Sequence, residues 1–259
     1  LWELQQFRQG HFEQINLNLH KQHGPVVRIA PNRFSIDDRD SIKQMYAYGT
    51  KFVKSQFYHT FTSPDPLFYN LFALSDPERH SKERRKVASL YSMSTLISYE
   101  KYVDSCNSLL CGKLENFALS GELINVPLWM QFYAFDVIGE MTVGKSFGFM
   151  QAGDDLSNLI EILHNNLVFA SRLGLFPELY PWIALGTKTL KINIAVRKLN
   201  SYVEDQIALR RSGNDDIDRA DFMAKLLELQ RIGRINYNDV RATLSSNIVA
   251  GSDTTAISL

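Results

Sequence analysis

The chain has 259 residues, of which 45% are hydrophobic and 22% are charged, an ordinary composition for a folded globular protein. Lysine and arginine together number 28, as do aspartate and glutamate, so the formal net charge is zero. A neutral chain without a concentrated basic run has no electrostatic basis for binding nucleic acid. The length allows one large domain or two small ones, with a substantial hydrophobic core.

Cysteine usage and apolar runs narrow the class further. Cys106 and Cys111 lie on one predicted helix and point in different directions, so they cannot form a disulfide, and a reducing compartment is favoured. No apolar stretch approaches the roughly 20 residues that span a bilayer, and no signal peptide is present. The chain starts at Leu1 and stops within an apolar helix at Leu259, so we expect it to be part of a longer protein.

The first predicted elements are a helix, a small sheet and a second helix. Apolar residues from Leu4 to Leu19 predict an amphipathic helix that stops near Gly24. Two short strands separated by a turn predict an opening sheet at about residues 26–36. Asp37 is expected to cap a helix over residues 39–46.

Residues 55–73 lack regular periodicity but are rich in aromatic side chains. The aromatic residues are Phe57, Tyr58, Phe61, Phe68, Tyr69 and Phe72, around Pro64 and Pro66. Long irregular loops in compact domains are usually functional or mobile. Two interpretations stay open, because these side chains either pin the loop onto the core or line a binding pocket.

A helix over residues 77–92 carries a candidate anion site. Asp76 is an N-cap and Pro77 suits the first turn. His80 and Arg84 are one turn apart and point the same way, and an imidazole beside a guanidinium suits a carboxylate or phosphate. The alternative is a solvated basic helix face.

The middle of the chain predicts several core helices. A stripe from Tyr99 to Phe117 includes Cys106 as a small core residue. Residues 128–143 are apolar nearly all round, so this helix should be buried on most sides, and Asp136 and Glu140 within it need partners.

Two further helices and an acidic segment follow. The expected helices cover residues 154–173 and a stretch that ends near Arg211, with a break at Gly174, Pro177 and Pro181 between them. The pattern is that of a helical hairpin. Residues 214–221 carry four aspartates and read as an exposed linker or a cap, before a short helix over 221–230.

The last predicted helix, over residues 237–259, carries the most informative pattern. Val240, Leu244 and Ile248 recur every four residues. Glycine in a helix interior costs about 1 kcal/mol relative to alanine, so Gly251 invites an explanation. Next to Ala250, it leaves a patch of bare backbone that Thr254 borders, with the acid Asp253 beside it. The alternative is a buried helix with a packing glycine.

This pattern resembles a known family. The run Ala250-Gly251-Ser252-Asp253-Thr254-Thr255 is similar to the oxygen-activating motif on the long central helix of cytochromes P450, and His80-x-x-x-Arg84 resembles the family's haem-propionate motif. Tyr91-Ser92 stands where the family often has Phe-Ser. The order of sheet, aromatic loop, His-x-x-x-Arg helix, helical hairpin and central helix resembles the family over the whole chain, most closely fungal, membrane-bound members.

The resemblance implies a mainly α fold with a small β-sheet (α+β), as part of a single P450-like domain over residues 1–259 in which 154–211 form a lid. It implies catalytic roles for Asp253 and Thr254 in delivering protons to dioxygen. The implied haem-binding residues are His80, Arg84, Ala250 and Gly251, and the implied substrate contacts are Phe57, Phe61, Phe72 and Asn247.

The implied activity is that of a haem-thiolate monooxygenase that uses heme b and acts on a small apolar organic substrate. Electrons would come from NADPH-cytochrome P450 reductase, at the cytosolic face of the endoplasmic reticulum membrane, through an N-terminal anchor that this chain lacks. The family's cysteine loop is absent, and Cys106 and Cys111 lack its flanking residues, so the axial cysteine is expected beyond Leu259 and no metal ligand within the chain.

Two other classes stay open. One is a haemless, non-catalytic helical interaction protein on a P450-like scaffold. The other is a helical enzyme of different chemistry, for which the sequence offers no nucleophile–base pair and no metal-ligand cluster.

Overall fold

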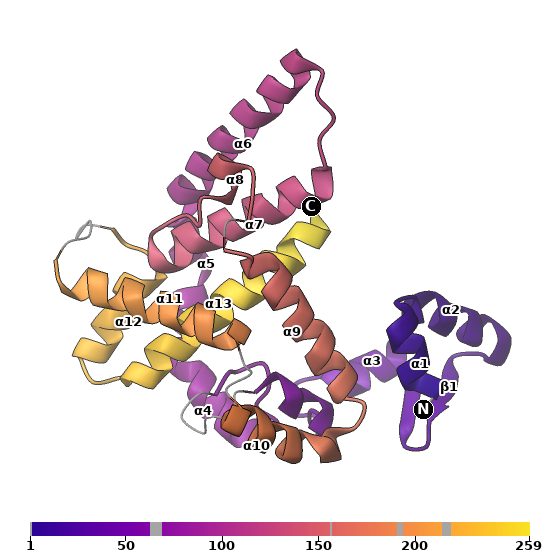
Figure 1. Ribbon diagram of the computed structural model, residues 1–259. Helices are drawn as coiled ribbons and strands as arrows, with labels where there is room; N and C mark the ends of the chain where they lie inside the picture. The colour runs from indigo at the N-terminus through magenta and orange to yellow at the C-terminus, as the bar shows by residue number, and fades with distance from the viewer. Residues whose placement is uncertain (1, 63–68, 156, 191–193, 214–218) are drawn as a thin grey trace.

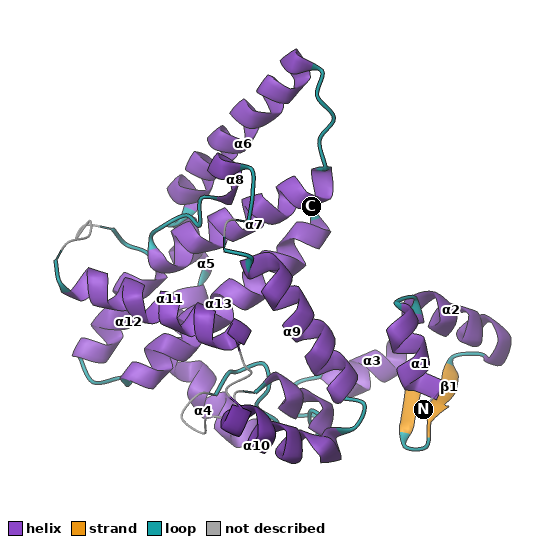
Figure 2. Cartoon of the chain, in the orientation of Figure 1, coloured by secondary structure: helices purple, strands orange, loops and turns teal. Residues whose placement is uncertain are grey.

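The computed structural model describes residues 2–62, 69–155, 157–190, 194–213 and 219–259. Over these residues the chain is mainly helical with one small sheet, so the predicted α+β class is confirmed (Figure 2).

The predicted elements occur in the predicted order, together with short helices that the sequence did not predict. The N-terminal region has α1 (Trp2–Gln9), α2 (Phe12–His23), β1 (Val26–Ala30), β2 (Arg33–Ile36), α3 (Arg39–Tyr46) and the 3₁₀ helix η1 (Gln56–Phe61). The middle has α4 (Pro77–Val87), the 3₁₀ helix η2 (Ala88–Tyr91), α5 (Met93–Ile97), α6 (Glu100–Ser120), α7 (Val126–Val143) and α8 (Phe149–Ala152). The remainder has α9 (Leu159–Leu173), the 3₁₀ helix η3 (Pro177–Leu179), α10 (Tyr180–Leu190), α11 (Ile194–Arg211), α12 (Phe222–Arg231) and α13 (Tyr237–Ser258). Among the helices that the sequence did not predict are α5, α8 and α10.

The first four elements, α1, α2, β1 and β2, lie to one side of the helical body, whereas η1 packs against α9 (Figure 1). The single helix expected over Leu4–Leu19 is wrong, because Gly10 adopts a left-handed conformation (φ 81°) between α1 and α2. The two predicted strands are confirmed as an antiparallel hairpin. Asp38 rather than Asp37 caps α3, since its carboxylate accepts a hydrogen bond of 2.7 Å from the Ser41 amide.

The centre of the molecule is the packing of α13 against α7 (Figure 1). The apolar α7 buries Phe132 and Phe135 almost completely, as its sequence predicts. On α13, Gly251 meets Ile138 of α7 so closely that a Cβ at position 251 would lie 2.7 Å from the Ile138 Cδ1 atom. The helices approach at this point because residue 251 has no side chain.

The buried acid Asp136 of α7 holds the segment that follows the helix. Its carboxylate accepts hydrogen bonds from the amides of Gly148 (2.8 Å), Phe149 (3.2 Å) and Met150 (2.9 Å). These amides form the start of α8, so the carboxylate caps the N-terminus of this short helix. A buried charge that sequence reasoning left without a partner is satisfied by backbone donors.

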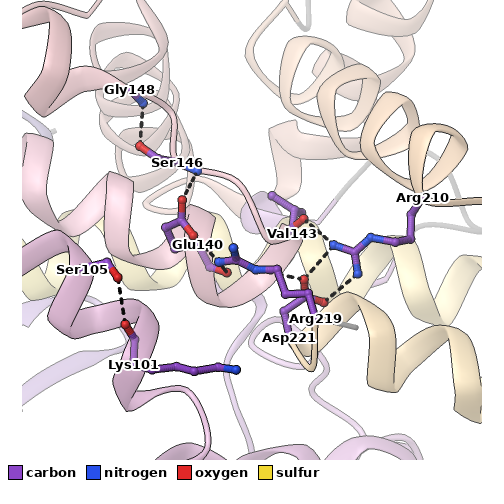
Figure 3. Close-up of polar contacts among 9 residues, drawn as sticks. All are labelled: Lys101, Ser105, Glu140, Val143, Ser146, Gly148, Arg210, Arg219 and Asp221. Carbon is purple, nitrogen blue, oxygen red and sulfur yellow. Dashed lines mark hydrogen bonds and ion pairs between the residues drawn. The ribbon is translucent and has the colours of Figure 1, made fainter. Parts of the chain in front are cut away.

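The second acid of α7, Glu140, belongs to a network of charges that joins three helices (Figure 3). Arg219 pairs with the Glu140 carboxylate and lies 3.7 Å from that of Asp221. Asp221 is fully buried, pairs with Arg210 of α11 at 2.8 Å and caps α12 through the Ala224 amide. The network thus fixes α11 and the start of α12 against the end of α7.

The remaining predicted elements are found with shifted limits. The helix expected over 77–92 consists of α4 followed by η2, and the helix expected over 154–173 begins later, at Leu159. The break around Gly174 contains η3 and the start of α10. Several residues named in the predictions lie outside the described ones, among them Phe68, Pro64, Pro66, Ile192 and residues 214–218 of the acidic segment. None of the described helices is long and apolar enough to cross a membrane.

The contact between Gly251 and Ile138 leads to a stability prediction. In Gly251→Ala the new Cβ would lie 2.7 and 2.8 Å from the Ile138 Cδ1 and Cγ1 atoms. We expect the free energy of unfolding to fall by about 1–3 kcal/mol, because overpacking outweighs the better helix propensity of alanine. Urea unfolding followed by circular dichroism measures this.

The control is Gly112→Ala in α6, where an added Cβ has no atom within 4 Å. This variant should gain up to about 1 kcal/mol from helix propensity alone. If both substitutions stabilise the protein equally, the packing role of Gly251 is wrong.

Candidate functional site

The second half of α13 presents two different sides. Gly251 lies against α7, while the neighbouring residue Ala250 is exposed. Thr254 is also exposed, and its hydroxyl donates a hydrogen bond of 2.6 Å to the Ala250 carbonyl. The open part of the predicted patch is therefore the side of Ala250 and Thr254, whereas the bare face of Gly251 is filled by Ile138.

Asp253 is oriented by α7. Its Oδ1 atom accepts a hydrogen bond of 2.9 Å from the side-chain amide of Gln131, and the residue is partly buried. A carboxylate held in one position next to a hydroxyl-bearing turn is suited to passing protons along the helix. Gln131 was not predicted as a site residue, and no motif in the sequence identifies it, because it comes from a helix 122 residues earlier.

Asn247 joins α13 to the end of η2. Its Oδ1 atom accepts a hydrogen bond of 2.6 Å from the hydroxyl of Tyr91. Burial raises the pKa of Tyr91, so the hydroxyl keeps its proton and remains a donor. The Asn247 side-chain nitrogen is buried and has no hydrogen-bond partner among the described residues. The predicted substrate contact Asn247 thus has one hydrogen bond made and one donor available.

The predicted anion site on α4 gains a third basic residue. His80 is partly buried and Arg84 is exposed. Burial lowers the pKa of His80 first, and the positive charges of Lys54 and Arg84 lower it further. Burial also lowers the pKa of Lys54. A carboxylate among these three residues would relieve the repulsion between them.

Lys54 also contacts both ends of the aromatic loop. Its ammonium group donates to the carbonyl oxygens of Leu71 (3.2 Å) and Phe72 (2.6 Å) and lies over the rings of Tyr58 and Phe72. It therefore closes the base of the loop over residues 55–73. Nothing in the local sequence pattern predicts this, because the partners are 17 and 18 residues away.

The three predicted substrate-contacting phenylalanines form one cluster but differ in exposure. The ring centroids of Phe57 and Phe61 are 5.6 Å apart, and those of Phe61 and Phe72 are also 5.6 Å apart. Phe72 is 59% exposed, whereas Phe57 and Phe61 are partly buried. The partly buried Phe57 and Phe61 fit the interpretation that the aromatic side chains pin the loop onto the core, and the pocket-lining interpretation stays a prediction.

The end of the aromatic loop is also tied to α4 and α13. The hydroxyl of Tyr69 lies 2.5 Å from carboxylate oxygens of both Glu83 and Asp239. Lys86 bridges the same two carboxylates, at 2.5 Å and 3.3 Å. Burial, followed by the bonds to these acids, raises the pKa of Tyr69 strongly. Asp239 belongs to the capping box that begins α13, so the aromatic loop, α4 and α13 meet at one cluster.

The sequence of the chain is similar to those of one protein family. The sequence profile named Cytochrome P450 matches residues 1–259. A pisatin demethylase of Fusarium vanettenii is 35% identical over 266 residues, which cover 100% of this chain and 52% of the relative. A cytochrome P450 monooxygenase of Aspergillus terreus is 31% identical over 264 residues, covering 95% of this chain and 52% of the relative. A benzoate 4-monooxygenase of Aspergillus niger is 27% identical over 293 residues, covering 98% and 54%.

The chain spans about half the length of the curated relatives it matches. The family match nevertheless extends over every residue of the chain, and the two sequence motifs lie on α4 and α13. This chain belongs to the cytochrome P450 family.

Proposed function

We propose that this chain forms part of a haem-thiolate monooxygenase, which inserts one oxygen atom of dioxygen into an apolar organic substrate. The observation that carries the proposal is the hydrogen bond between Tyr91 and Asn247. It joins η2, the 3₁₀ helix that directly follows α4 with its His80–Arg84 motif, to α13, the helix of Ala250 and Thr254, across 156 residues of sequence. The two motifs therefore lie on neighbouring elements of the fold, as two motifs that bind one cofactor would have to.

The residues around these two helices fit a haem group. Basic side chains suit its propionates, and we assign this role to His80 and Arg84, which pair with no carboxylate among the described residues, with Lys54 nearby. The exposed Ala250 gives a flat surface on which a planar group can lie. The buried, unpaired nitrogen of Asn247 is a donor that a ligand between the helices can use. When bound, haem with a thiolate ligand supplies the chemistry that activates dioxygen.

The chain's own contribution to the reaction is proton delivery. Asp253, held by Gln131, accepts a proton from solvent and passes it toward the hydroxyl of Thr254. The Thr254 hydroxyl donates its proton to the Ala250 carbonyl in this structure, and rotation away from that carbonyl would present the proton on the exposed side of α13. We assign Gly251 no direct role in oxygen binding. Its role is to pack closely against Ile138, which sets the position of Ala250.

Substrate and partners follow from the family and from the aromatic loop. P450 monooxygenases generally act on organic substrates and receive electrons from a redox partner. The exposed ring of Phe72 and the neighbouring Phe61 give an apolar, aromatic surface for the substrate. One relative is named for benzoate, an aromatic acid. We propose heme b as the cofactor, NADPH-cytochrome P450 reductase as the electron donor, and the cytosolic face of the endoplasmic reticulum as the site of action.

The direct test is the carbon monoxide difference spectrum of the reduced native polypeptide, purified from its source. We expect the red-shifted Soret band that is typical of thiolate-bound haem. If the spectrum lacks this band although the protein is folded, the monooxygenase assignment is wrong. A haemless interaction protein on the same scaffold then becomes the explanation.

Arg84→Ala in the full-length protein tests propionate binding. Hydrogen bonds to a charged group are worth about 1.5–3 kcal/mol, so haem affinity should fall about 10- to 100-fold. The rate of haem transfer to apomyoglobin measures this. Arg85→Ala is the matched control, because Arg85 is equally exposed on α4 and its side chain donates to the Ser81 carbonyl of its own helix. Unchanged haem loss in Arg84→Ala would contradict the assignment.

Thr254→Ala in the full-length protein tests proton delivery. We expect less product per NADPH oxidised and more hydrogen peroxide, because the hydroxyl that presents the proton is lost. Thr255→Ala is the control, since Thr255 is the next residue on the same exposed turn. Product yield per NADPH should stay near the wild-type value in the control, and an equal fall in both variants would argue for a general effect on the helix.

A further inference from the structure

The junction after α9 contains a glycine that its backbone does not require. Gly174 has φ −61° and ψ −18°, a conformation that any residue adopts. A Cβ at this position would lie 2.5 Å from the Cδ2 atom and 2.6 Å from the Cε2 atom of Phe57. Gly174 is therefore needed for space, because the ring of Phe57 lies against its bare Cα.

Two hydrogen bonds flank this contact. The buried Thr60 hydroxyl lies 2.9 Å from the Ala170 carbonyl in the last turn of α9. The hydroxyl of Tyr180, at the start of α10, donates a bond of 2.9 Å to the Thr62 carbonyl. Residues 57–62 of the aromatic loop thus contact residues 170–180 at three points.

The backbone at Gly174 is held from a third direction. Its carbonyl accepts a hydrogen bond of 2.9 Å from the guanidinium of Arg33 in β2. The same guanidinium pairs with Glu3 of α1 at 3.0 Å. Because the backbone at residue 174 is anchored to the opening sheet, added bulk there displaces the ring of Phe57 rather than the chain around Gly174.

The displacement would continue through the aromatic cluster. Phe57 packs on Phe61, and Phe61 packs edge-on against the exposed ring of Phe72. Phe57 packs against Gly174, whereas Phe72 is exposed to solvent, so the two rings at the ends of the cluster have different environments.

We propose that Phe57 is a positioning residue: its contact with Gly174 fastens the aromatic loop to the α9–α10 junction, so that the two segments move together and set the positions of Phe61 and Phe72. This assigns substrate contact to Phe61 and Phe72 and removes Phe57 from that set. The consequence for substrate rests on the proposed monooxygenase function, whereas the coupling of the two segments does not.

Hydrogen–deuterium exchange of the full-length holoprotein tests the coupling. In both Gly174→Ala and Phe57→Ala, we expect amide exchange of residues 56–62 and 170–180 to rise together, by about tenfold or more. The double variant should exchange no faster than the single variants, because both remove one contact. Gly186→Ala in α10, where an added Cβ meets nothing within 4 Å, is the control and should leave both segments unchanged.

Tyr180→Phe is a milder variant that keeps the fold. Loss of its hydrogen bond to Thr62 should raise exchange in the same two segments by about two- to tenfold. A rise confined to one segment, additive effects in the double variant, or no change would each overturn the proposal.

Substrate binding supplies a second readout, followed by the shift of the Soret band on substrate addition. Phe57→Ala should raise the dissociation rate of substrate with little change in the rate of the chemical step, because a positioning residue does not touch the reacting atoms. Coupled exchange in a protein that lacks the thiolate Soret band would sustain the coupling and refute the monooxygenase function. The thiolate band together with independent exchange of the two segments would do the reverse.

Discussion

The close approach of α13 to α7 at Gly251 and Ile138 is the contact on which the rest of the structure depends. Because α7 lies directly against α13, one polar side chain of α7 can bond to α13 while others bond to the segment that follows α7. Gln131 reaches α13 and orients Asp253, while Asp136 and Glu140 hold the segment that follows α7. A side chain at position 251 would push the two helices apart and move Asp253 away from its partner.

The two acids of α7, Asp136 and Glu140, fix the orientation of a helix that is otherwise mostly apolar. The hydrophobic effect is non-directional, so in a helix that is hydrophobic all round only the detailed packing and the few polar residues determine the rotation about its axis. Asp136 fixes this rotation by accepting hydrogen bonds from three backbone amides, and Glu140 fixes it again through Arg219. The fully buried Asp221, shared between Arg210 and the start of α12, extends the same constraint to the neighbouring helices.

Sequence reasoning succeeded where the signal is local. The helix of Ala250 and Thr254, the cap at Asp76 and the hairpin after Gly24 depend on spacing and on residues within one or two turns, and all are found. It failed where two neighbouring residues offer the same chemistry, as with Asp37 and Asp38, and where one glycine divides an amphipathic pattern, as at Gly10. The first error concerns the capping residue of an element that exists, whereas the second replaces one expected helix by two.

The site itself divides in the same way. His80 and Arg84 are one turn apart, so a sequence pattern can pair them, but Lys54 reaches them only through the tertiary fold. Likewise, Asn247 was identified from its place on α13, while its partner Tyr91 lies 156 residues earlier. A residue that contacts a motif from another element shows no periodic pattern in the sequence. Such residues are identified only from the three-dimensional arrangement of the elements.

The glycines that matter most for this arrangement are those in ordinary right-handed backbone. Gly174 and Gly251 both have backbone conformations that alanine also adopts. The space that a Cβ would need is nevertheless filled by a neighbouring side chain, that of Phe57 at Gly174 and that of Ile138 at Gly251. A glycine within a helical pattern therefore indicates a close neighbour, and the sequence alone does not tell whether that neighbour is a ligand or the protein. On α13 the answer differs between adjacent residues, because successive side chains on a helix point about 100° apart. Gly251 meets α7, whereas Ala250, beside the hydroxyl of Thr254, is exposed and is the residue to which we assign contact with the proposed haem.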